Sequence, residues 1–290
     1  MQELIDPRLN EMESRIAESS GFIKSMLNVR PKVAIILGSG LGGLTSAIES
    51  AVEISYDTIP HFARSTAAGH QGMLVCGTMC GQNVIAMAGR FHAYEGRHRD
   101  EIVYPIHVFA DLGVSALIVS NAAGAVNTNY RVGDIVVIQD HIDLMLGSAS
   151  LRFSRQNDDR DVSISALRRG SPYNRTFCEQ ALATARLAGF SAHPGTYLAT
   201  LGPNYETRAE YRMMKRLGAD VVGMSTVPEV REASRLGLSV LALSMVSNLA
   251  LPDAPVQADH QEVLDAGSIA GPRMQRIVEE FLLRFNGDSD

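Results

Sequence analysis

Short, continuous apolar runs alternate with amphipathic stretches along most of the chain. A run of four to eight apolar residues bounded by glycine or polar residues is typical of a buried strand, whereas apolar positions every three or four residues are typical of a helix that covers a sheet. The runs predict strands over the ranges 33–37, 74–77, 83–87, 116–120, 134–138, 195–200, 220–223 and 239–246. The amphipathic stretches predict helices over the ranges 6–28, 100–112, 173–188, 207–218, 226–237 and 261–285.

Turn and capping residues mark the boundaries of these elements. Thr207 is followed by Glu210, and Thr226 by Glu229, with the spacing of a capping box at a helix N-terminus. Strands that alternate with capped helices predict one α/β domain over residues 1–290, with a mainly parallel or mixed central sheet and helices on both faces. The N-terminal helix lies within residues 1–30, and the charge-dense residues 147–172 are expected to form a long surface loop.

The first predicted strand, over residues 33–37, runs into a glycine-rich turn. Gly38, Gly40 and Gly43 let the backbone adopt positive φ angles and leave amide N–H groups available to surround an anion. Ser39 adds a hydroxyl, and the helix expected to follow would point its positive end at the same place. The turn therefore predicts an anion-binding site at the carboxyl end of this strand.

The same turn has two other interpretations, a tight turn without a ligand and a dinucleotide-binding fingerprint. The spacing G-x-G-x-x-G is present, but neither Glu53 nor Asp57 closes a convincing buried strand where the dinucleotide fold holds a ribose hydroxyl. An NAD-binding oxidoreductase is therefore a remote alternative. A triphosphate-binding P-loop is excluded, because no Gly-Lys-Ser/Thr follows the glycines.

The composition of the chain argues against nucleic-acid, membrane and metal partners. The net charge of −6 argues against a nucleic-acid binder or a membrane-surface binder, which normally presents a basic face. Residues 1–6 lack the basic and apolar regions of a signal peptide, and no apolar run is long enough to cross a bilayer. Cys76, Cys80 and Cys178 form no Cys-x-x-Cys pair, so we expect reduced core residues of a cytoplasmic protein. No His/Cys cluster has zinc spacing, so no metal is expected.

Polar side chains follow several predicted strands, at the carboxyl ends where ligands bind in such sheets. Arg90 and His92 are two residues apart, so on an extended segment they point the same way, and a guanidinium beside an imidazole suits a phosphate oxyanion. His70 lies in a Gly-flanked loop that could close over the anion. Asn248 ends an otherwise apolar strand and offers both a donor and an acceptor. The other residues at strand ends are Ser39, Tyr94, Asn121, Ala122, Asn204, Tyr205, Glu206, Met224, Ser225 and Ser247.

Each of these residues also has an ordinary structural interpretation. Arg90 could form an exposed salt bridge, and His70 could be an ordinary residue of a surface loop. Met224 could be a core residue, and Glu206 could simply precede a helix N-terminus. No Gly-x-Ser-x-Gly elbow, metal cage or activated cysteine accompanies the set. The protein therefore offers no nucleophile of its own. The residues fit a reaction in which inorganic phosphate is a substrate and acts as the nucleophile, while the site also holds a neutral aromatic nucleobase.

Several sequence strings together resemble the trimeric purine nucleoside phosphorylases of the inosine–guanosine type. The strings stand at residues 36–42, 69–70, 89–96, 121–124, 202–207 and 223–229, and the similarity covers about residues 23–263. The resemblance implies the nucleoside phosphorylase fold and a homotrimer. It implies reversible phosphorolysis of purine (deoxy)ribonucleosides to free base and (deoxy)ribose 1-phosphate in purine salvage, with phosphate as co-substrate and no cofactor. A carboxylate at Glu206 would accept from N1–H, which only a 6-oxopurine carries, so inosine and guanosine are expected over adenosine.

The resemblance also implies a role for each matching residue. The phosphate ligands would be Ser39, His70, Arg90, His92, Ser225 and the amide of Ala122. The residues in contact with the sugar would be Tyr94, Met224 and His260, and those in contact with the base Tyr205, Glu206, Val222 and Asn248. The residues expected to take part in catalysis are His92, Glu206 and Asn248.

Three stretches depart from the family pattern. Residues 147–172 include no assignable aromatic residue for a neighbouring subunit's sugar pocket, with Phe153 the nearest candidate. Tyr205 stands where many relatives have Phe, and the segment between Asn248 and His260 also differs. A phosphorylase that prefers methylthioadenosine or xanthosine is an alternative, although Asn248 and Met224-Ser225 disfavour methylthioadenosine. A nucleoside-binding protein without catalysis is another alternative.

Overall fold

The computed structural model describes residues 7–38, 42–64, 71–145, 170–253 and 260–287. The strands are β1 (Val33–Leu37), β2 (Glu49–Ser55), β3 (Met73–Met79), β4 (Gln82–Ala88), β5 (Ala116–Ala125), β6 (Ile135–Asp143), β7 (Ala192–Ala199), β8 (Val221–Gly223) and β9 (Ser239–Leu249). The α-helices are α1 (Pro7–Met26), α2 (Arg99–Asp111), α4 (Arg175–Leu187), α5 (Arg208–Leu217), α6 (Val227–Arg235) and α7 (His260–Arg284). Short 3-10 helices are η1 (Gly42–Ala47), η2 (Tyr56–Thr58) and η3 (Ala93–Glu95).

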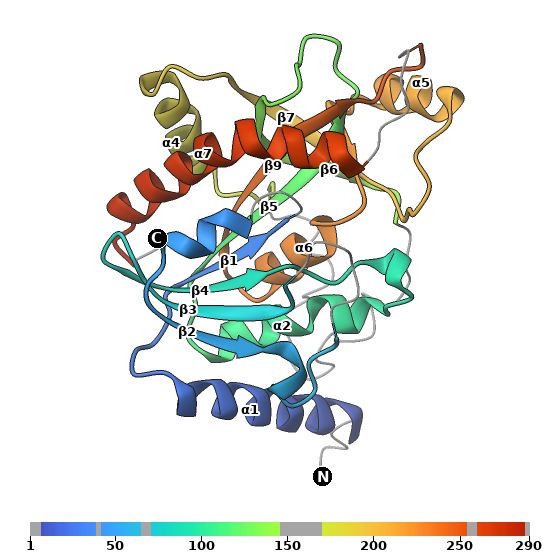
Figure 1. Cartoon of the computed structure of the whole chain (residues 1–290). Coiled ribbons are helices and arrows are strands. Elements are labelled where there is room, and N and C mark those ends of the chain that lie inside the picture. The colour runs from blue at the N-terminus through green and yellow to red at the C-terminus, as the bar shows by residue number, and fades with distance from the viewer. Residues whose placement is uncertain (1–6, 39–41, 65–70, 146–169, 254–259, 288–290) are drawn as a thin grey trace.

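The strands of the described residues form one sheet in the order β2-β3-β4-β1-β5-β8-β7-β6-β9. The pairs β1–β4, β1–β5, β5–β9, β6–β7 and β7–β8 are parallel, and the pairs β2–β3, β3–β4, β5–β8 and β6–β9 are antiparallel. Because β5 also pairs with β9, the strands β5, β8, β7, β6 and β9 close into a ring, from which the other four extend (Figure 1). The predicted α/β fold with a mixed sheet is confirmed.

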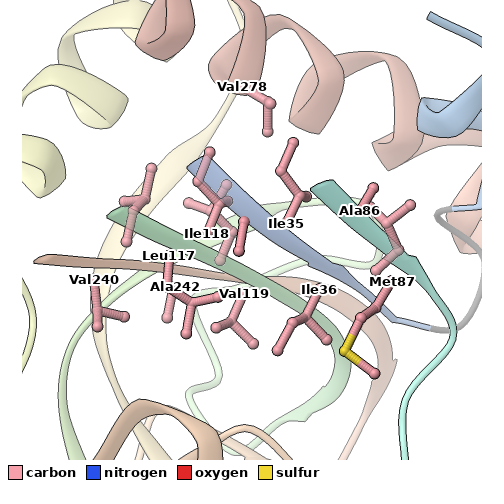
Figure 2. Close-up of a cluster of buried hydrophobic side chains, with 14 of the residues drawn as sticks. Ile35, Ile36, Ala86, Met87, Leu117, Ile118, Val119, Val240, Ala242 and Val278 are labelled. Atoms are coloured by element: carbon pink, nitrogen blue, oxygen red, sulfur yellow. The ribbon is translucent and has the colours of Figure 1, made fainter. Parts of the chain in front are cut away.

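The centre of the sheet is apolar on both faces. All of β1 is buried, as expected of a parallel strand that is covered on both sides. Figure 2 shows Ile35 on the side of α7, where Val278 lies. Its neighbour Ile36 points to the opposite side with Met87 and Val119, because successive side chains of a strand alternate. Burying each such side chain contributes roughly 1.5–3 kcal/mol, which fixes the register of the central strands.

Helices cover the sheet in two groups. In the first group α1 packs against α2, and α2 against α6, which contacts β9. In the second group α4 packs against α7, and both helices contact β6 and β9 (Figure 1). The predicted N-terminal helix is α1, whereas residues 146–169, most of the predicted surface loop, lie outside the described residues.

Two elements after the glycine turn differ from what the sequence indicated. The segment after the turn forms the six-residue 3-10 helix η1 rather than an α-helix, consistent with the low helix propensity of Gly42 and Gly43. Residues 49–55 form the edge strand β2, which was missed because most of its residues are exposed and leave no apolar run. Glu53 pairs with Val75 of antiparallel β3, while β1 pairs only with β4 and β5. Among the described residues β1 therefore starts no β-α-β unit of a dinucleotide fold, which contradicts the NAD-binding alternative.

Several strands are longer than predicted. β5 continues to Ala125 and β9 to Leu249, so the polar residues at their carboxyl ends lie on paired strands rather than in loops. The register between the two strands shifts after Ala123, and from there Gly124 pairs with Asn248. The sheet therefore fixes the backbone positions of these polar residues, and it does so more rigidly than a loop would.

Candidate functional site

A cavity of about 190 Å³ opens at the carboxyl ends of β5 and β9, beside β8. Its walls also include the loop after β4 and the start of α5. The residues that line it are Gly38, Arg90, His92, Tyr94, Asn121, Ala122, Ala123, Gly124, Tyr205, Glu206, Tyr211, Val222, Gly223, Met224, Ser225, Ser247, Asn248, Ala250 and Val263.

Ten of the site residues predicted from the sequence line this one cavity: Arg90, His92, Tyr94, Ala122, Tyr205, Glu206, Val222, Met224, Ser225 and Asn248. Ser39 and His70 lie outside the described residues. His260 is the first residue of α7, and its side chain also lies outside the described part of the structure. Their roles, and those of the ten, stay predictions.

Three polar residues of the cavity wall were not among the predicted ligands. Asn121 and Ser247 stand beside the predicted residues Ala122 and Asn248, so their position at a strand end was the available signal. Tyr211 lies on α5, four residues after Thr207, and no local pattern marks it as a cavity residue.

Arg90 is buried and is held by groups from distant parts of the chain. Its side chain is 2% exposed. Nη1 donates to Thr226 Oγ1 at 3.1 Å, to Glu229 Oε1 at 3.3 Å and to Ser225 Oγ at 3.4 Å. Nη2 donates to the carbonyl oxygens of Ile36 and Ser120. The fork is thus fixed by the protein at the cavity wall, and the interpretation of Arg90 as an exposed salt-bridge residue is wrong.

Glu229 is the buried counter-charge of Arg90. Burial raises the pKa of the Glu229 carboxyl, and the positive charge of Arg90 opposes that shift. Two buried charges 3.3 Å apart stabilise each other only when both are well hydrogen-bonded, so removing one of them would be costly. The pair therefore holds a positive group at the cavity without leaving its charge unbalanced.

Thr226 links the groups around Arg90. The predicted capping box is wrong, because the Thr226 side chain makes no capping bond and the residue adopts φ 75° and ψ −50°. Its Oγ1 instead accepts from Arg90 and from Asn121 Nδ2 at 2.9 Å, and it lies 3.2 Å from Ser225 Oγ. A positive φ in a β-branched residue is a strained conformation, of the kind held at functional sites by surrounding contacts.

His92 and Tyr94 form one side of the cavity. His92 Nδ1 lies 2.9 Å from Glu95 Oε1, which also accepts from the backbone N–H of His92 and so orients the ring. The rings of His92 and Tyr94 stack, with centroids 4.6 Å apart and planes 17° apart. Burial raises the pKa of the Tyr94 hydroxyl, and the nearby Glu95 carboxylate adds to the shift.

Asn248 is fixed by its neighbours on two strands. Its Oδ1 accepts from Ser247 Oγ at 2.9 Å, and the residue is buried. A Cβ at Gly124 would lie 3.2 Å from Asn248 Nδ2 and 2.8 Å from the Cβ of Ala250. The glycine therefore makes room for the carboxamide beside β5, and Nδ2 remains able to donate into the cavity.

Glu206 stands on the loop before α5. Its Oε1 accepts from Thr200 Oγ1 at 2.9 Å. Tyr211 is the second neighbour of Glu206. Burial raises the pKa of the Tyr211 hydroxyl to about 12, and the charge of Glu206 and a hydrogen bond to Glu206 add to the shift. The capping box predicted for α5 is confirmed, with Glu210 and Thr207 bonded in both directions, so the N-cap of α5 follows Glu206 directly.

Other chemistry receives no support from the described residues. None of their His, Cys, Asp or Glu side chains gather in threes or more around a possible metal position. Cys76, Cys80 and Cys178 are free, and burial raises the pKa of each thiol, so none is an activated nucleophile. None of the described helices combines the length and the apolarity that crossing a membrane requires.

Comparisons with known proteins show which family the chain resembles in sequence and in fold. Residues 32–283 match the phosphorylase superfamily. Purine nucleoside phosphorylase 1 of Bacillus subtilis (strain 168) is 42% identical over 279 residues, which cover 94% of this chain and 100% of the relative. A schistosoma purine nucleoside phosphorylase solved with hypoxanthine has a TM-score of 0.82 and 34% identity, covering 94% of this chain and 97% of its own. The Schistosoma mansoni enzyme solved with adenosine has a TM-score of 0.83 and 35% identity, covering 95% and 98%.

Proposed function

The chain belongs to the phosphorylase superfamily and is a purine nucleoside phosphorylase, and from this premise we propose that its substrates are 6-oxopurine nucleosides such as inosine and guanosine. A phosphate oxygen attacks C1′ of the sugar, the C1′–N9 bond breaks, and the electron pair of that bond leaves with the purine. The products are the free base, after it takes up a proton, and (deoxy)ribose 1-phosphate.

The phosphate side of the proposed site is built around Arg90. Arg90, His92 and Ser225 would hold the anion together with the amide of Ala122, and Ser39 and His70 complete the proposed set. A fixed positive group in a largely buried cavity attracts an anion more strongly than it would in water. Positive charge develops on the sugar carbon as the bond breaks, and a phosphate held against it would stabilise that charge.

Asn248 would stabilise the departing purine. Negative charge spreads over the base as the glycosidic bond breaks, and the carboxamide can hydrogen-bond the N7/O6 edge of the ring. The contact with Ser247 supports this role, because it fixes Oδ1 and leaves Nδ2 as the donor. A donor that meets charge only in the transition state lowers the barrier rather than merely tightening binding.

Glu206 would select the base. Its carboxylate accepts from N1–H of a 6-oxopurine, whereas a 6-aminopurine presents a lone pair at that position. Leaving a buried acceptor unpaired costs about 1–3 kcal/mol, more for a charged group, so inosine should react faster than adenosine. Tyr205 and Val222 would contact the base, and Tyr94, Met224 and His260 the sugar.

The observation that carries the proposal is the convergence of Arg90, Glu206 and Asn248, separated by up to 158 positions, on one cavity. The test is release of hypoxanthine from inosine with and without inorganic phosphate. We expect release only when phosphate is present, and ribose 1-phosphate in equal amount. Binding of guanosine without phosphate-dependent release would identify a nucleoside-binding protein instead.

The finer substrate preference is tested in the same assay. Because the Schistosoma mansoni relative was solved with adenosine, binding alone does not separate the candidates, and kcat/KM is the quantity to compare. Inosine and guanosine should exceed adenosine and methylthioadenosine, whose bases carry no N1–H. Xanthosine carries N1–H, and a kcat/KM for it above those of inosine and guanosine would identify a xanthosine-preferring enzyme. A homotrimer and a cytoplasmic location belong to the same proposal, and light scattering of the purified protein tests the trimer.

A further inference from the structure

Glu206 would read the base from a loop with exposed side chains on either side of it in the sequence. Leu201 and Tyr205, on the same connection between β7 and α5, are each 50% exposed. A carboxylate on such a segment has several accessible rotamers, and recognition of N1–H needs one of them. The direction of the Glu206 carboxylate therefore has to be fixed by a side chain on a more rigid element.

Thr200 has the position and chemistry to do this. It directly follows β7, and its backbone N–H donates to the carbonyl oxygen of Gly223 on β8 at 2.9 Å. Its hydroxyl donates to Glu206 Oε1 at 2.9 Å. Thr200 does not line the cavity, so it joins the loop carboxylate to the sheet without itself meeting a ligand.

We propose that Thr200 is a positioning residue for base selection: its hydroxyl occupies Glu206 Oε1 and leaves the second carboxylate oxygen to accept from N1–H of the purine. The proposal rests on the proposed function of Glu206. Tyr211, on α5, lies near the same carboxylate, whose charge helps to raise the pKa of the Tyr211 hydroxyl. Selection between 6-oxo and 6-amino purines therefore depends on a hydroxyl outside the cavity.

The test compares Thr200→Val, which keeps the shape and removes the hydroxyl, with Thr200→Ser, which keeps the hydroxyl. We expect Thr200→Val to lower kcat/KM for inosine roughly 10- to 100-fold, the range for losing one hydrogen bond to a charged group. The KM for phosphate and kcat/KM for adenosine should stay within about twofold, and Thr200→Ser should restore activity toward inosine. Thr196→Val, on the same strand, is the matched control and should leave the inosine-to-adenosine ratio unchanged.

If adenosine turnover is too slow to measure, a double-mutant cycle with Glu206→Ala tests whether Thr200 acts through Glu206. Because Thr200 acts through Glu206, Thr200→Val should have no further effect on inosine once the carboxylate is gone. Additive losses, or an unchanged inosine-to-adenosine ratio in Thr200→Val, would overturn the role of Thr200. An unmodified protein that releases no hypoxanthine with phosphate would overturn the proposed function itself.

Discussion

Gly124→Ala tests whether the close approach of β5 and β9 positions Asn248. The new Cβ would lie 2.8 Å from the Cβ of Ala250 and 3.2 Å from Asn248 Nδ2. Apolar carbons prefer about 3.5–4.0 Å, so the first contact is too short by at least ~0.7 Å. The two strands cannot simply separate, because Ala250 N–H donates to the carbonyl oxygen of Ala125 at 2.8 Å.

Two effects of different size follow from that overlap. Adding a methyl group to a packed site typically costs about 1–3 kcal/mol of unfolding free energy. The strain also displaces the carboxamide by some tenths of an ångström, and a misplacement near 1 Å can cost roughly 100-fold in rate. We therefore expect kcat/KM for inosine to fall about 10-fold or more, with the KM for phosphate nearly unchanged.

The assay is thermal unfolding together with steady-state kinetics, and Gly271→Ala is the control. A Cβ at Gly271, on α7, would meet nothing within 4 Å, so that variant should be as stable as the unmodified protein or more so. If Gly124→Ala kept full activity toward inosine, the proposed positioning of Asn248 by the strand pair would be refuted.

Three further predictions concern other groups. Asn248→Ala should lower kcat/KM for inosine more than it weakens phosphate binding, and equal losses would contradict a leaving-group role. Thr226→Val should raise the KM for phosphate about 10-fold while Thr226→Ser stays near the parent, which phosphate titrations check. Burial works against ionisation of Glu232, but hydrogen bonds from His107 and Arg235 outweigh it and lower its pKa to about 2. Its stabilisation is therefore present above the ordinary value of 4.5 and is lost as pH falls toward 2, so Glu232→Gln should flatten that part of a pH–stability curve.

The central part of the fold could be predicted because its signals are local. A strand buried on both faces, such as β1, is a continuous apolar run, and this pattern depends little on what covers it. The capping box of Thr207 and Glu210 lies within four residues at an exposed helix end, where few other partners compete for either side chain. Both predictions were confirmed.

The same capping signal failed at Thr226 because the partners there are distant. Glu229 pairs with Arg90, which stands 139 positions earlier, and Thr226 Oγ1 is taken by Arg90 and Asn121. Nothing within a window of a few residues indicates that these groups meet. The capping-box spacing predicts a cap only where the helix end is exposed. Thr226 and Glu229 are buried, so their side chains bond to Arg90 and Asn121 instead of forming a capping box.

The contacts of Glu206 could not be predicted for a related reason. Thr200 was interpreted only as the last residue of a strand, and Tyr211 only as part of a helix. Their relation to Glu206 arises because the intervening loop turns the carboxylate back toward both elements. The cavity residues at strand ends carry a signal in the sequence, whereas Thr200 and Tyr211, which support Glu206, carry none.

The two sides of the cavity differ in construction, and this difference bears on function. Arg90 is 2% exposed and Ser225 9%, and both are bonded to strands or buried side chains. Tyr205 is 50% exposed and stands on a loop beside Glu206. A change on the buried side would disturb a charge pair and the core, whereas loops accept substitution with little loss of stability. With the proposed roles, substitutions in the loop and its supports would change base preference at little cost in stability, while substitutions on the buried side would cost both phosphate binding and stability.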